Sequence, residues 1–315
     1  MDRGQAGLRT SALSVLRVVS LLPAGTEIVA ALGALDALVG VSHECDHPVE
    51  VTRLPRVTAS SVDHAASSSA IDSAVRALAR EGTPVFTIDA ADLVHLAPTV
   101  ILTQSLCEVC AVSDGEVRSV AEVLSSAPQV ISLGATTLAG VWHDIAAVGD
   151  ALGRREAAAE LLASIAARLR RVHDTLETAR APRPRVAVIE WLDPLFAAGH
   201  WTPDLVRCAG GIDTLSEPGA HSVVMSIDRL RAATPDVLLF APCGFDVTRA
   251  GREANALLAR PEWAWAQACA CWSLDGNALT SRPGPRLADA VETMAAIFAP
   301  TLFGMPPTAY ASRLR

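Results

Sequence analysis

The sequence predicts an α/β protein in which two parallel-sheet lobes, joined by one long backbone helix, enclose a ligand cleft. Short β-branched runs alternate with helical patterns, and this plan occurs once on each side of a long amphipathic stretch. In that stretch, residues 154–179, apolar side chains from Leu161 to Leu176 recur every three or four positions, as on one face of a helix. At about 1.5 Å per residue the helix reaches roughly 39 Å, which is enough to connect two small lobes.

Each half of the chain shows the elements of one such lobe. In the first half, Thr26 is the expected N-cap of the first helix, and Gly33 follows its end. The patterns there predict strands at 18–22, 38–42, 85–88, 100–104 and 130–133, and helices at 26–32, 71–80, 117–125 and 138–152. In the second half they predict strands at 186–191, 237–241 and 271–274, and helices at 203–208, 227–233, 254–259 and 286–298.

These elements define the expected organisation of the 315 residues. We expect a disordered tail at 1–16, an N-terminal lobe at 17–137, linking helices at 138–181 that include the backbone helix, a C-terminal lobe at 182–304 and a loose tail at 305–315. No apolar run approaches the roughly 20 residues that cross a bilayer, so no membrane-spanning segment is predicted. A net charge of −8 predicts no basic surface for nucleic acid. We also expect a monomer.

Polar and aromatic residues collect directly after the predicted strands. In open parallel sheets ligands bind beyond the carboxyl ends of the strands, so these residues are the candidates for a binding site. Histidines there can reach a metal, aromatic rings supply flat surfaces, and an arginine before a helix N-terminus suits an anion. The candidate ligand-binding residues are His43, Glu44, Asp46, Gln104, Glu190, Trp191, His200, Trp201, Phe245 and Arg282.

Several of the seven cysteines also fall in the predicted cleft loops. Cys107 and Cys110 have the spacing of metal thiolates and redox pairs, and Cys45 and Cys243 follow other strands, so these four are the candidate metal ligands. Cys208 and Cys269 are better explained as small buried hydrophobic residues. An odd number of cysteines suits free thiols or metal ligands in a reducing compartment.

Four segments carry a resemblance to a known family: 18–27, 39–42, 43–46 and 209–211, together with the long helix between the lobes. Over roughly residues 17–300 the chain resembles the helical-backbone class of periplasmic binding proteins. Within that class it is most similar to the branch that binds cobalamin (vitamin B12) and iron siderophores. The resemblance implies a ligand clamped between the lobes, little hinge motion and an ABC importer as partner. It also implies one carboxylate per lobe for docking to the importer, with Asp213 and Glu116 as the candidates.

Two functions follow from these observations. The first is a non-catalytic binding protein for a small metal chelate, either cobalamin or another corrinoid, with His43 or His200 approaching the cobalt. The alternative is a cytoplasmic metalloprotein or enzyme in which the four cleft cysteines bind zinc or an iron–sulfur cluster. The sequence lacks Gly-x-Ser-x-Gly and Gly-x-Gly-x-x-Gly motifs, which disfavours α/β-hydrolases and nucleotide enzymes. A cytoplasmic location is expected, because neither an apolar signal core nor a lipid-acceptor cysteine precedes the first strand.

Overall fold

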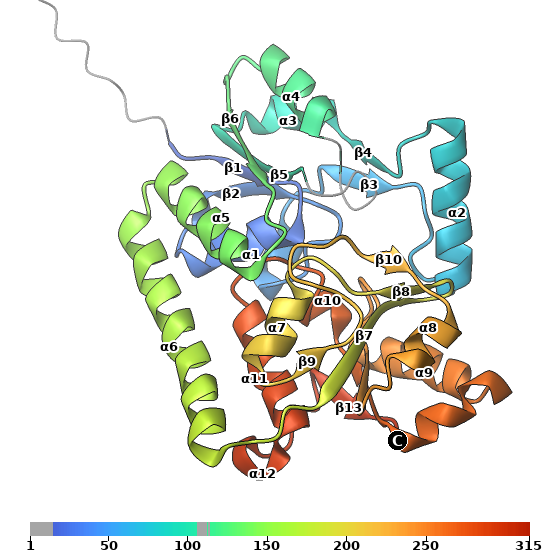
Figure 1. The fold of residues 1–315 in the computed structure, drawn as a ribbon. Helices are drawn as coiled ribbons and strands as arrows, with labels where there is room; N and C mark the ends of the chain where they lie inside the picture. Colours follow the sequence, from blue (N-terminus) through green and yellow to red (C-terminus); the bar gives the residue numbers. More distant parts are fainter. Residues whose placement is uncertain (1–14, 106–111, 113) are drawn as a thin grey trace, which may run out of the picture.

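The structure is a computed structural model that describes residues 15–105, 112 and 114–315. Cys107, Cys110 and nearly all of the expected N-terminal tail lie outside the described residues. In Figure 1 the N-terminal half forms the upper part of the molecule and the C-terminal half forms the lower part, with α6 running along one side of both. The predicted fold class, two α/β lobes joined by a long helix, is confirmed.

The N-terminal lobe is built on a parallel sheet of four strands in the order β2-β1-β5-β6. Its strands are short and largely buried, as β-branched runs packed on both faces should be. They are β1 (Val18–Ser20), β2 (Leu38–Val41), β5 (Val100–Gln104) and β6 (Gln129–Leu133). Around them lie α1 (Pro23–Ala31), α2 (Ser68–Glu81), α3 (Ala90–Leu96), α4 (Asp114–Val123) and the 3-10 turns η1 (Leu35–Ala37) and η2 (Val49–Arg53).

Two details of this lobe differ from the prediction. The helix α1 begins at Pro23, which suits the first helical position, so Thr26 is a buried residue inside the helix and not its N-cap. The strand β4 (Phe86–Ile88) does not join the parallel sheet, because it pairs antiparallel with β3 (Thr58–Ser60). This pair of strands forms a second, small sheet beside the main one.

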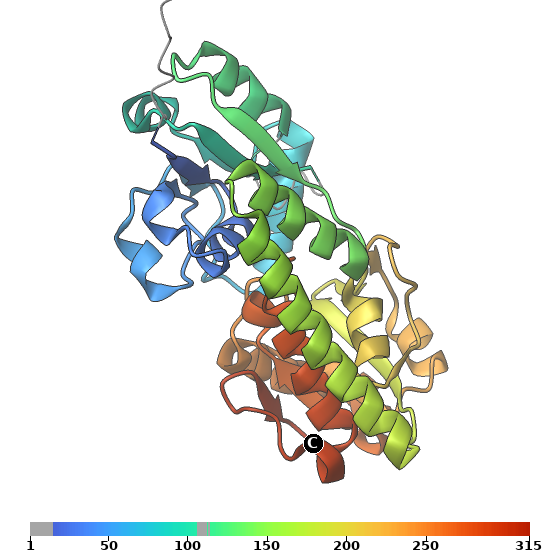
Figure 2. The ribbon, with the colours of Figure 1, turned by 90° about the vertical axis from the view of Figure 1, so that its left-hand side faces the viewer.

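The helices α5 (Leu138–Ala151) and α6 (Arg155–Ala179) connect the lobes. Gly153, with a φ of +65°, reverses the chain between them at no steric cost. Close packing follows, since a Cβ added at Gly149 would lie 2.5 Å from the Cβ of Ala158. Figure 2 shows α6 crossing the front of the molecule with α11 beside it, where Arg168 donates to Glu292 at 2.9 Å and also pairs with Asp289.

The C-terminal lobe has a mixed sheet in the order β10-β8-β7-β11-β12-β13, with β9 also paired to β7. Its centre, β7 with β11 and β12, is parallel, and its margins β8, β10 and β13 are antiparallel. The strands are β7 (Arg185–Leu192), β8 (Leu195–Ala197), β9 (Ile212–Asp213), β10 (Val223–Val224), β11 (Val237–Phe240), β12 (Ala270–Leu274) and β13 (Ala311–Arg313). The helices are α7 (Thr202–Cys208), α8 (Ile227–Ala232), α9 (Val247–Leu258), η3 (Pro261–Ala268), α10 (Gly276–Leu279), α11 (Leu287–Phe298) and α12 (Pro300–Phe303).

Two parts of this lobe contain more regular secondary structure than the sequence predicts. The segment expected to be a loose tail contributes β13, which pairs with β12 at the sheet margin. The helix α9 begins at Val247 and not at Ala254, because the Asp246 carboxylate caps it by accepting from the amide of Arg249. Among the described residues, none of the helices has the length and apolar character that a membrane crossing requires.

Candidate functional site

Charged and polar side chains of the two lobes meet in a set that we call the Arg282 network: Arg282, Arg286, Glu27, Asp46 and Asn277. The Arg282 guanidinium donates to Glu27 at 3.0 Å and to Asp46 at 2.5 Å, and Arg286 donates to Glu27 at 2.8 Å. Asn277 adds a bond of 3.1 Å to Asp46. Only 5% of the Arg282 side chain and 3% of the Glu27 side chain are exposed. The network therefore joins α1 and the loop after β2 to the start of α11.

Arg282 and Asp46, both predicted to bind the ligand, pair with each other in this arrangement, and their ligand role stays a prediction. Burial disfavours the charge on Arg282, but its carboxylate partners outweigh burial and raise its pKa. For Asp46, burial likewise opposes ionisation, and the hydrogen bonds and charge of Arg282 overcome it and lower the pKa. Both residues neutralise each other, so neither offers an unpaired charge to an anion or a metal.

A second group lies at the same strand end, and we call it the histidine cluster: His43, Glu44 and His64. One ring nitrogen of each histidine and one carboxylate oxygen of Glu44 all lie within 4.8 Å of one another. His43 and Glu44 follow β2, and His64 belongs to the loop before α2. The ring of Phe86 backs both histidines, with centroids 5.4 Å from His43 and 6.3 Å from His64. His64 is exposed, while His43 and Glu44 are half-buried.

The ionisation of this cluster is set by burial. Burial, together with the nearby charges of His64 and Arg56, lowers the pKa of His43 to about 4. The pKa of His64 is lowered by burial and by Arg249, and burial raises the pKa of Glu44 against the opposite effect of Arg282. His43 is therefore a neutral imidazole at neutral pH, which is the form that can donate a lone pair.

The C-terminal lobe faces this region with aromatic and charged side chains. Trp191, half-buried at the end of β7, donates from Nε1 to the carbonyl of Ser68 at 3.2 Å. Arg249 on α9 donates to the carbonyls of His64 and Ala66, both at 2.5 Å. Its guanidinium carbon lies 3.5 Å from the centre of the Phe245 ring. The loop that carries His64 is thus held from the opposite lobe.

The other predicted aromatic and polar residues have mixed outcomes. Phe245 is only 2% exposed beneath Arg249, and Trp201 is 6% exposed with its Nε1 bonded to the carbonyl of Thr280 at 2.8 Å. Little of either ring is exposed, and the ligand roles of Phe245 and Trp201 stay predictions. His200 is half-buried, and its ring centroid lies 5.3 Å from that of His221. Gln104 and Glu190 are half-buried at the ends of β5 and β7, and their ligand role stays a prediction.

Of the four candidate metal-ligating cysteines, Cys45 and Cys243 lie in the described part of the chain. Cys45 is 1% exposed, and its Sγ lies 3.1 Å from the hydroxyl of Thr26. Burial raises the pKa of its thiol to about 11, which disfavours the thiolate form that binds metals, and the role of Cys45 as a metal ligand stays a prediction. Cys243 is exposed after β11, and Cys107 and Cys110 lie outside the described residues.

Several residues of this region were missed from the sequence. Glu27 carried a signal, because it lies just beyond the carboxyl end of β1, where polar residues were sought. His64 carried none, since it belongs to a polar loop without a preceding main-sheet strand. Arg249 and Ser68 connect the lobes through a helix and a helix start that sequence patterns placed too late.

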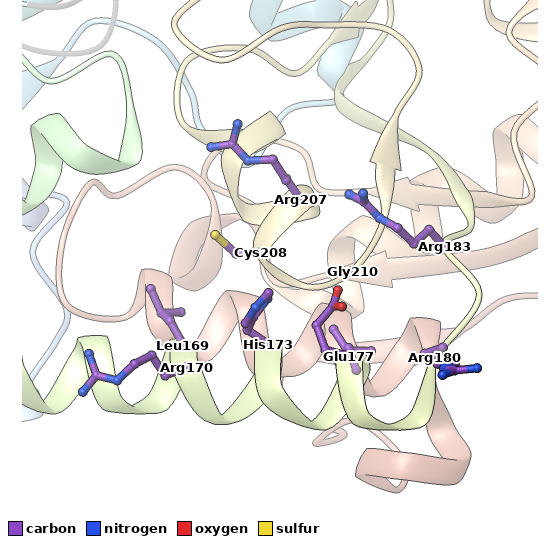
Figure 3. Close-up of a pocket in the computed structure, with 11 residues that line it drawn as sticks. Leu169, Arg170, His173, Glu177, Arg180, Arg183, Arg207, Cys208 and Gly210 are labelled. Carbon is purple, nitrogen blue, oxygen red and sulfur yellow. The ribbon is translucent and has the colours of Figure 1, made fainter.

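A separate hollow lies away from the strand ends, on the outer side of the C-terminal lobe. It has a volume of about 690 Å³ and lies between the second half of α6 and the end of α7. Figure 3 shows Arg183 and Arg207 on one side of it and Glu177 and His173 rising from α6 on the other. None of the predicted binding residues lines this hollow.

Comparison with known families identifies the family of this chain. The model of the family described as periplasmic binding protein matches residues 18–270, which is most of the chain. The chain therefore belongs to this family, and the resemblance drawn from the sequence is confirmed. Its members are binding proteins and not enzymes.

Solved structures share the fold at low identity. A periplasmic heme-binding protein from Pseudomonas aeruginosa has 21% identity and a TM-score of 0.70, over 93% of this chain and 96% of that one. The periplasmic heme-binding protein BhuT with two hemes has 24% identity and a TM-score of 0.66, over 91% and 98%. The periplasmic vitamin B12 binding protein BtuF of Vibrio cholerae has 21% identity and a TM-score of 0.61, over 90% and 96%. A search of curated proteins finds no match.

These comparisons overturn the expected cytoplasmic location. The family and the compared structures are all described as periplasmic. The expectation was based on the lack of a clear apolar signal core and lipid-acceptor cysteine before the first strand. Membership of a periplasmic family is the stronger evidence. The alternative of a cytoplasmic metalloprotein with a cysteine-bound metal is likewise unsupported.

Proposed function

We propose that this chain is a non-catalytic binding component that delivers a metal chelate to an ABC importer. Within that class we propose cobalamin or another corrinoid as the ligand. Membership of the periplasmic binding protein family is the observation that carries the proposal. Heme and vitamin B12 are the ligands named for similar structures, and both are flat macrocycles around a metal.

The lobe contact supplies groups that suit such a ligand. Trp191 is half-buried and offers part of a flat ring beside the lobe contact, and flat rings pack well against a macrocycle. His200 is half-buried, and burial and the neighbouring His221 lower its pKa, which favours the neutral form that binds cobalt or iron. His200 is therefore the proposed axial ligand on the C-terminal lobe.

The importer is the proposed partner. Of the two carboxylates implied by the family resemblance, Asp213 already accepts from the amides of Leu215 at 2.8 Å and Ser216 at 2.9 Å. Asp213 thus shapes the loop after β9. We propose that the surface of the lobe around this loop contacts the importer. Glu116 on α4 is half-buried and keeps its proposed role on the N-terminal lobe.

A spectroscopic titration tests the ligand. Hydroxocobalamin and hemin are titrated separately into the purified full-length protein while the visible spectrum of each chelate is followed. We expect hydroxocobalamin to bind with a shifted spectrum and His200→Ala to weaken binding, while His95→Ala on the exposed face of α3 has no effect. Binding of hemin alone would replace the corrinoid by heme, and binding of neither chelate would reject the proposal.

A further inference from the structure

The histidine cluster contains a buried nitrogen atom without a hydrogen-bond partner among the described residues. The Nε2 atom of His43 is buried and has no hydrogen-bond partner anywhere in the described ranges 15–105, 112 and 114–315. A buried polar atom without a partner is costly, and such atoms usually mark a missing water, ion or ligand. The other ring nitrogen, Nδ1, lies 2.7 Å from the hydroxyl of Thr58.

The hydrogen bonds of Thr58 determine which nitrogen of His43 carries the proton. The Thr58 hydroxyl donates its only hydrogen to Ser42 at 3.1 Å and accepts from the backbone amide of His43 at 3.0 Å. It must therefore also accept from Nδ1, which places the His43 proton on Nδ1 and leaves a lone pair on Nε2. A histidine whose second nitrogen is fixed by a hydrogen bond is the usual arrangement at metal sites.

We propose that His43, Glu44 and His64 form a binding site for a bare first-row divalent cation of the zinc class. Two imidazole nitrogens and one carboxylate are donors that zinc prefers. Donors about 2.1 Å from a tetrahedral zinc stand roughly 3.4 Å apart, so separations of up to 4.8 Å close with small side-chain movements. His64 is exposed and can make that movement.

The surrounding charges permit the ion. Three guanidinium groups are near, and each is bonded elsewhere. Arg56 donates to the carbonyls of Ser42 at 2.8 Å and Cys45 at 2.6 Å, Arg249 holds the loop of His64, and Arg282 pairs with Glu27 and Asp46. The Glu44 carboxylate offsets their charge. Three protein donors leave one coordination position for water or a donor atom of another molecule.

This site goes beyond the proposed chelate, because it needs no macrocycle and uses only residues of the N-terminal lobe. It assigns His43 to a protein-bound ion and leaves His200 to approach the metal of a chelate. The two proposals therefore fail separately: a bare ion tests the histidine cluster, and hydroxocobalamin tests the lobe contact.

Zinc binding to the full-length protein, stripped with EDTA and studied under reducing conditions, tests the site by calorimetry. We expect one equivalent of zinc to bind. His64→Ala and Glu44→Gln should weaken it by more than about 100-fold, beyond the roughly 10- to 100-fold typical of lost outer-shell contacts. His95→Ala is the matched control, since His95 is also exposed but lies on α3. Because His64 and Glu44 are at or near the surface, circular dichroism should show unchanged folding in both variants.

Cobalt(II) provides the second measurement, because its visible spectrum reports the ligand atoms. Nitrogen and oxygen ligation should give d–d bands without a thiolate-to-cobalt charge-transfer band, and His64→Ala should abolish the d–d bands. The proposal is overturned if the protein binds no zinc, if His64→Ala and Glu44→Gln both keep the original affinity, or if cobalt shows thiolate ligation.

Discussion

The Arg282 network and the histidine cluster use neighbouring residues of one loop and reach opposite states. Asp46 in the first has its carboxylate bonded to Arg282 and Asn277, whereas His43 in the second keeps a buried nitrogen unpartnered within the described residues. Polar residues that follow the same strand can therefore differ in whether their hydrogen bonds are already made within the protein. A complete set of opposite charges holds the lobes together, and an incomplete set of donors is where a ligand can add a bond.

The largest expected effect comes from breaking the Arg282 network. Glu27→Gln removes the charge that faces Arg282 and Arg286 in a buried site, so we expect about 3–5 kcal/mol less free energy of unfolding in urea. Asp150→Asn, which breaks an exposed pair with Arg155, should cost far less. Equal losses in the two variants would mean that the network does not stabilise the lobe contact.

The next effect sharpens the description of the histidine cluster. Thr58→Val keeps the shape of the side chain but removes the hydroxyl that fixes the His43 ring, so zinc affinity should fall by about 10- to 100-fold. Thr52→Val is the control, because the Thr52 hydroxyl bonds only locally, to the carbonyl of Val49. Unchanged affinity after Thr58→Val would show that this hydrogen bond does not orient His43.

A smaller effect concerns the half-exposed contact between α6 and α11. Hydrogen bonding to Arg168 lowers the pKa of Glu292, so this pair stabilises the folded state above the ordinary glutamate pKa and loses that effect as the pH falls through the lowered value. Urea unfolding of wild type and Glu292→Gln should differ by about 1 kcal/mol or less at pH 7, and the two should converge in acid. A difference that stays constant down to pH 3 would contradict this sign.

The smallest expected effect is a difference in cysteine labelling. It tests whether the Arg282 network keeps the loop after β2 inaccessible to a reagent. Cys45 is buried with a pKa of about 11, and Cys243 is exposed. A brief iodoacetamide pulse on the native protein, mapped by mass spectrometry, should label Cys243 and spare Cys45. Equal labelling of both would show that the loop opens readily.

Much of the fold could be predicted, because long periodic segments carry their own signal. The predicted strand 100–104 matches β5, and the predicted helix 154–179 matches α6 within one residue at its start. Short margin strands were missed: β8, β9 and β10 have two or three residues each, and β13 forms only because β12 offers it a partner. Pairing over such a distance in sequence leaves no local pattern.

The site was predictable only in part. The sequence drew attention to His43 and Glu44, because residue type and position after a strand are both local features, and their ligand role stays a prediction. The burial of Phe245 depends on Arg249 lying over it, and the proximity of His64 depends on a loop held from the other lobe. These are tertiary contacts. Residue type and spacing therefore could not show which side chains pair with other side chains, as Phe245 does with Arg249, and which remain available to a ligand.

Anomalous diffraction from a zinc-soaked crystal tests the contrast between the two regions most directly. Data collected on either side of the zinc absorption edge locate the ion without reference to activity or stability. We predict one strong peak within bonding distance of the Nε2 atom of His43, the Glu44 carboxylate and a ring nitrogen of His64, and no peak at Glu27 and Asp46. A peak at the Arg282 network, or an empty histidine cluster at saturating zinc, would contradict the account.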